Sequence, residues 1–154
     1  MHNINGFIGP VDELERLTTG IKNAKIVPLD VDGLGFLPRT DAILGEMKNG
    51  WYAFGEKAQV PLAHVETDYF GGAGDQSAAV WDKGQKVYRR KATGAINEAL
   101  RQIGVKEAGG MDRFDTVGLG KYRTNEDWAE HGTEELERQE AIRVLDELAK
   151  GRET

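Results

Sequence analysis

One run of alternating apolar and polar residues, LAHVETDYF at positions 62–70, restricts the fold more than any other segment. Successive side chains of a strand point to opposite faces of its sheet, so this alternation predicts a β-strand. We expect Ala63, Val65, Thr67 and Tyr69 on one face, and His64, Glu66 and Asp68 on the other. The middle of the chain is therefore committed to a sheet with one polar face.

The residues that follow predict two more strands of the same sheet. The glycine-rich stretch GGAGD, 71–75, separates the first strand from a second at 76–82. DKGQ, 82–85, then predicts a tight hairpin into a third strand at 85–89, because Gly84 adopts a positive φ at low cost. We expect an antiparallel meander whose 71–75 turn is exposed, with its glycines at positive φ.

Helical patterns lie on both sides of this meander. One begins at Gly9-Pro10 and runs to Gly20, a second follows Thr40 as N-cap to Met47, and a third follows Thr93 to Gly104. Thr124 and Asp127 form a capping-box pattern for a turn of helix, and an amphipathic helix begins at Thr133. These patterns predict one α+β domain over residues 1–154, in which N-terminal, middle and C-terminal helices pack on the meander.

Further segments give weaker expectations. KIVPLDV, 25–31, predicts an edge strand because Pro28 cannot donate to a ladder; 33–40 predicts a loop, and FDTVGLG, 114–120, a last short strand. We expect the core to include large apolar residues from the second strand and two helices: Trp81, Ile96, Leu100, Ile103, Val144, Leu145 and Leu148.

Composition excludes several classes of protein. The net charge of −6 and pI of about 5.1 argue against a nucleic-acid binder, which needs clustered cations. The absence of cysteine excludes disulfides and thiolate chemistry, and it fits a reducing compartment. The chain shows neither a secretory signal pattern at its start nor an apolar run of ~20 residues. We therefore expect a cytoplasmic protein that binds neither nucleic acid nor membrane.

The polar face of the 62–70 strand carries the first candidate site. His64, Glu66 and Asp68 point the same way and have the donor types of a metal site or an acid–base group. The alternative is a solvated or partner-facing surface. Three side chains from one strand leave zinc one ligand short and a hard cation several short. We therefore expect no metal and no cofactor here.

A second candidate lies in IVPLDVDGLG, 26–35. It resembles the first motif of haloacid-dehalogenase-type phosphatases, in which an apolar strand ends in Asp-x-Asp-Gly. That resemblance implies Asp30 as nucleophile and Asp32 as general acid, with Asp75 as a candidate partner for magnesium. The family usually has threonine or valine after that glycine, whereas this chain has Leu34. An Asp-Gly turn after a strand explains the same residues.

A longer resemblance covers roughly residues 62–128, through VETDYFGGAGDQSAAVW, GAINEALRQIGV and FDTVGLGKYRTNEDW. This pattern is similar to uncharacterised bacterial proteins, some of them associated with immunity proteins of polymorphic toxin systems. The resemblance implies bacterial origin and carries no established activity. We expect a non-enzymatic protein-binding domain with a protein partner, of which an immunity-type protein is one form. The alternative is a small metal-dependent hydrolase or phosphatase. The surface expected to bind lies around the first hairpin: His64, Glu66, Asp68, Tyr69, Phe70, Asp75 and Gln76.

Overall fold

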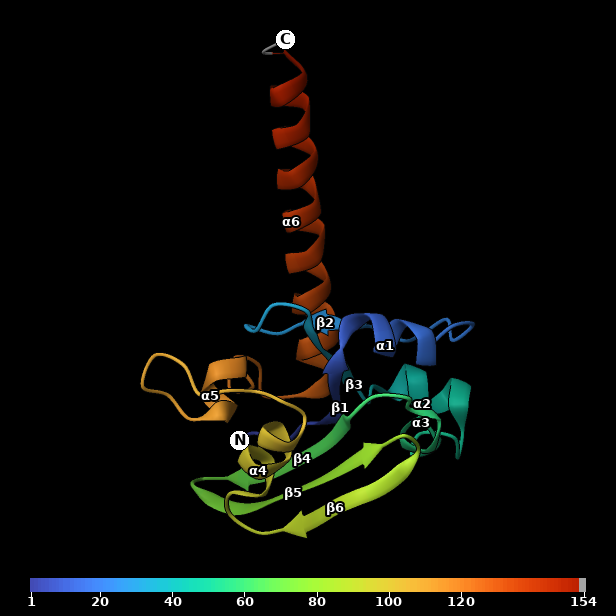
Figure 1. Ribbon diagram of the computed structural model, residues 1–154, viewed down its shortest axis with the longest axis vertical. Helices are drawn as coiled ribbons and strands as arrows, with labels where there is room; N and C mark the ends of the chain where they lie inside the picture. The colour runs from blue at the N-terminus through green and yellow to red at the C-terminus, as the bar shows by residue number, and fades with distance from the viewer. Residues whose placement is uncertain (153–154) are drawn as a thin grey trace.

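An antiparallel sheet of six strands forms the centre of the molecule (Figure 1). The computed structural model describes residues 1–152, without the side chains of residues 133–136, 139 and 152. The strands are β1 (Asn5–Pro10), β2 (Val27–Pro28), β3 (Leu34–Pro38), β4 (Leu62–Phe70), β5 (Ala73–Asp82) and β6 (Gln85–Lys91). Their order is β2-β3-β1-β4-β5-β6, so the strand nearest the N-terminus lies inside the sheet.

The predicted meander is the β4-β5-β6 half of this sheet, and the α+β fold class is confirmed. β4 and β5 pair from Leu62 opposite Trp81 to Phe70 opposite Ala73. The connecting turn is shorter than the expected 71–75, because residues 73–75 already pair with β4 as the start of β5. Residues 71–75 are exposed, and Gly71, Gly72 and Gly74 all have positive φ, as expected. The two-residue turn at Lys83-Gly84 then leads into β6, with Gly84 at φ +81°.

Helices cover both faces of the sheet, and each face has its own apolar core. α1 (Val11–Leu17), α2 (Asp41–Met47) and α3 (Ala53–Lys57) cover part of one face, over buried residues such as Phe7, Trp51 and Trp81. α4 (Ala95–Gln102), α5 (Arg113–Val117) and the start of α6 (Asn125–Arg152) cover the other face. Ile96 and Leu100 are fully buried there, as predicted.

Several local predictions were wrong. The expected loop at 33–40 contains β3, because residues 34–38 are buried and pair with both β1 and β2. The expected strand at 114–120 is helix α5, which Asp112 caps by accepting from the backbone N–H of Asp115. Helix α4 begins after Gly94 in a left-handed conformation, so Thr93 is not its cap.

The C-terminal helix departs furthest from the prediction. The capping box is present, since Thr124 Oγ1 accepts from the Asp127 N–H, but the helix continues unbroken to residue 152 and projects away from the sheet (Figure 1). Val144, Leu145 and Leu148 are 43%, 65% and 57% exposed, so their expected place in the core was wrong. Ile103, another predicted core residue, is partly buried. Among the described residues no helix is long and apolar enough to cross a membrane.

Candidate binding basin

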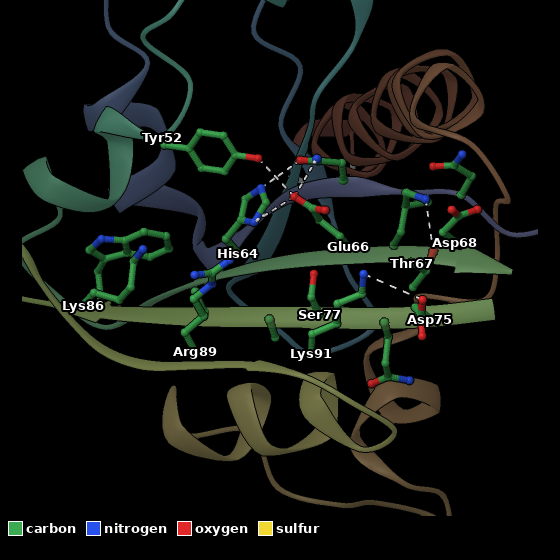
Figure 2. A pocket seen from close by; sticks show the side chains of 17 residues that line it. Tyr52, His64, Glu66, Thr67, Asp68, Asp75, Ser77, Lys86, Arg89 and Lys91 are labelled. Atoms are coloured by element: carbon green, nitrogen blue, oxygen red, sulfur yellow. Dashed lines mark hydrogen bonds and ion pairs between the residues drawn. The ribbon is translucent and has the colours of Figure 1, made fainter.

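The helices α1, α2 and α3 leave the outer half of their sheet face uncovered. This area is concave and encloses a volume of about 690 Å³. We call it the basin. β4, β5 and β6 form its floor, while residues of β1 and the turn before α3 form one wall (Figure 2). Its polar and charged side chains are Asn3, Asn5, Tyr52, His64, Glu66, Thr67, Asp68, Asp75, Gln76, Ser77, Lys86, Arg89 and Lys91.

Strand register explains why these residues meet. Glu66 lies opposite Asn5 of β1 and opposite Ser77 of β5, while Ser77 lies opposite Lys91 of β6. Side chains directly opposite one another share a face of the sheet, so these four form a polar row across four strands. The predicted polar face of the 62–70 strand is therefore one strip of a wider polar surface.

His64 lies at the inner end of the basin among aromatic rings and is 4% exposed. Its ring centroid is 4.8 Å from that of Phe7 and 5.2 Å from that of Tyr52. Its Nε2 accepts from the indole N–H of Trp51 at 3.2 Å and lies 2.8 Å from the side-chain oxygen of Asn5. His64 was expected on a solvated or partner-facing surface, but the imidazole is enclosed by these contacts.

This enclosure sets the protonation state of the histidine. Burial lowers the pKa of His64 to about 3, and the positive charges of Arg39 and Lys86 act in the same direction. The imidazole is therefore neutral at pH 7, and its Nδ1, 3.9 Å from Glu66, does not form an ion pair. A group with so low a pKa is a poor general base at neutral pH, because it holds a proton too weakly.

Glu66 connects the histidine to the open part of the basin. Its Oε1 accepts from the Tyr52 hydroxyl at 3.1 Å and from the Asn5 side-chain amide at 3.1 Å (Figure 2). Burial, and then the adjacent Glu66 carboxylate, raise the pKa of Tyr52. The phenol therefore stays protonated, and its O–H group donates the hydrogen bond to Glu66. Glu66 itself is 40% exposed, which leaves carboxylate surface available to a partner.

The remaining charges of the basin lie toward solvent. Asp68 and Asp75 are directly opposite one another in the β4–β5 register, where like charges are unfavourable. Lys91 offsets this repulsion in part, with its Nζ 3.8 Å from Asp75. At the other end Lys86 lies over the Trp81 ring, 5.1 Å from its centroid. The side chain of Arg89 forms no ion pair or hydrogen bond with any residue that the structure describes.

The structure divides the predicted surface into three places. His64, Glu66, Asp68, Asp75 and Gln76 line the basin. Tyr69 and Gln76 make a structural contact: the Gln76 amide donates to the Tyr69 hydroxyl, and its oxygen accepts from the Ile96 N–H at the start of α4. Phe70 is 77% exposed at the end of the hairpin.

The phosphatase arrangement does not fit this fold. Asp30 and Asp32 follow the edge strand β2 in an antiparallel sheet, whereas the motif needs a parallel strand. Asp30 instead accepts from Lys121 Nζ at 3.0 Å. Neither it nor Asp75 belongs to a group of potential metal ligands within the described residues. The one such group there is Asp127, Glu130 and His131, on one helix.

Several basin residues were missed by sequence reasoning. Asn5 and Tyr52 lie far from β4 in the sequence, in segments without a readable period, so no local pattern connects them to Glu66. Arg89 and Lys91 are different, since they alternate within YRRK and a strand would place them on one face. The turn alone would not have placed them on the basin, because a bulge at Val87 shifts the β5–β6 register by one residue and so turns Arg89 and Lys91 toward it.

Comparison with protein-family models, curated proteins and solved structures gave no match. We therefore argue the function from the geometry and charge of the basin.

Proposed function

We propose that this protein is a non-enzymatic protein-binding domain of bacterial origin, of the type that neutralises a toxin. The observation that carries the proposal is the basin, an open half of a sheet face on which charged side chains of both signs lie exposed. Asp68, Asp75, Arg89 and Lys91 can each form ion pairs with a partner without first leaving a buried position.

The chemistry of the basin favours binding over catalysis. The histidine that sequence reasoning offered as an acid–base group is neutral and enclosed, and it accepts a hydrogen bond from Trp51. Ser77 forms no hydrogen bond with a described side chain that could activate it as a nucleophile. What remains is a polar floor in which Tyr52 and Asn5 each donate a hydrogen bond to Glu66.

The distribution of charge favours a protein partner. Complementary charges on two surfaces increase the rate of association and select against wrong partners. A net charge of −6 attracts a basic partner at long range, and the acid pair Asp68 and Asp75 lies at the exposed end of the basin. Phe70 is exposed close by and provides an apolar contact of the kind that anchors interfaces.

The test is capture of a partner from extract of the source bacterium with purified, immobilised protein. We expect the wild type to retain a specific protein, and the double variant Asp68→Lys/Asp75→Lys to retain at least tenfold less of it. Asp32→Lys/Asp146→Lys makes the same change of charge at exposed positions outside the basin, and should capture as the wild type does. Equal capture by the two double variants, or no specific capture by the wild type, would refute the proposal.

A further inference from the structure

The outer edge of β6 has no partner strand in the described part of the chain. β6 pairs on its inner side with β5 and is the last strand in the sheet order, so its other side faces solvent (Figure 1). An open strand edge presents unpaired backbone N–H and C=O groups, which are a template for another extended chain.

The side chains of this strand are unusually basic for an acidic protein. Gln85–Lys91 reads QKVYRRK, with four cations and no carboxylate. Arg89 lies opposite Ala79 and faces the basin, whereas Arg90 lies opposite Ala78 and faces the other side of the sheet. Neither arginine pairs with an acid among the described residues. Arginines without an acidic partner, Arg89 and Arg90, therefore lie on both faces of the sheet at the open edge.

This charge pattern argues against a second copy of the chain as the occupant. Pairing two β6 edges would bring the cations of one strand against those of the other, and like charges directly opposite one another destabilise a sheet. Carboxylates on an added strand would face Arg89 and Lys91 on one side and Arg90 on the other. Val87, the extra residue of a bulge opposite Trp81 and Val80, is 59% exposed and offers an apolar contact on the same strand.

We propose that β6 binds an extended acidic segment of another protein, which adds to the sheet as a seventh strand. The proposal rests on the protein-binding role proposed above and adds a second contact of the opposite charge. The partner's basic surface would face Asp68 and Asp75, while an acidic segment of the same partner pairs its backbone with β6, with specificity from Arg89, Arg90 and Lys91. The added strand would also extend the floor of the basin, because Arg89 and Lys91 lie at the basin's open side.

Three end-blocked synthetic peptides provide the test. In the first, glutamate alternates with threonine; in the second, lysine replaces each glutamate; the third repeats the first with every backbone nitrogen methylated. Binding is measured by titration calorimetry, and the position of binding by hydrogen exchange of the amides of residues 85–91. We expect the glutamate peptide to bind, to slow exchange in 85–91, and to bind more weakly as salt is added.

Charge variants locate the interaction. Arg89→Glu/Arg90→Glu should weaken binding of the glutamate peptide at least tenfold, whereas Lys25→Glu/Lys106→Glu, the same change at exposed positions elsewhere, should leave it unchanged. No binding of the glutamate peptide, equal binding of the lysine or methylated peptide, or unchanged exchange in 85–91 would overturn the proposal. Each of these results would leave the basin test above intact, because that test changes Asp68 and Asp75 alone.

Discussion

The enclosed imidazole of His64 should make the stability of the fold depend on pH. An unfolded chain protonates this histidine near pH 6.5, whereas the folded chain holds its pKa at about 3. The folded state therefore loses stability relative to the unfolded state as the pH falls from 6.5 toward 3, where protonation favours unfolding. Between pH 7 and pH 5 the difference in proton affinity predicts a loss of about 2 kcal/mol from this one residue.

Urea denaturation at pH 7, 6 and 5, followed by tryptophan fluorescence, measures this loss. His64→Gln keeps an acceptor for the Trp51 indole N–H but has no group that titrates in this range, so its stability should change by less than about 0.5 kcal/mol over the same interval. His131→Gln removes an exposed histidine and should retain the loss seen in the wild type. If wild type and His64→Gln lost stability in parallel, the assigned protonation state of His64 would be wrong.

Two further predictions concern packing, and urea denaturation at pH 7 tests both. Leu145→Glu, on the projecting part of α6, should change the free energy of unfolding by less than about 0.5 kcal/mol. Leu100→Ala, in the core, should lower that free energy by about 2–5 kcal/mol. A large effect of Leu145→Glu would mean that this part of α6 is packed against other residues. Gly55→Ala should destabilise by about 1–3 kcal/mol, because a Cβ there would overlap the Trp81 ring. Gly45→Ala, in open space within α2, should instead stabilise by about 0.5–1 kcal/mol; similar effects at the two glycines would contradict the packing described at Gly55.

The parts of the fold that sequence reasoning predicted are those fixed by local contacts. The β4-β5-β6 meander follows from alternation and from glycines in its turns, and α2 follows from the Thr40 cap. β3 was missed because all five of its residues are buried, so it shows no alternation to read. Its neighbour β1 was missed for another reason, because every residue it pairs with lies at least 24 positions away in the sequence.

The long C-terminal helix shows the limit of an apolar periodicity. One apolar stripe does run along this helix, formed by Ala141, Val144, Leu145 and Leu148. Such a stripe shows which face of a helix is apolar, but it does not show whether another element covers that face. At the basin the same limit applies to polarity. His64, Glu66 and Asp68 share one face as predicted, yet their separation into one enclosed and two exposed groups depends on Trp51 and Phe7, which arrive from other segments.

The interior position of β1 in the sheet also affects how the protein folds during its synthesis on the ribosome. Asn5 pairs with Glu66, and its backbone N–H donates to the side chain of Asn125, so the first strand made is completed by residues made much later. At a synthesis rate of about 5–20 residues per second, β1 waits roughly 3–12 s for β4 to be made. During that time the apolar segment around Phe7 and Ile8 can pair only with β3, which is made before β4. Slow codons in the first third of the message, or a chaperone bound to the nascent chain, would therefore change the yield of folded protein without changing the amino-acid sequence.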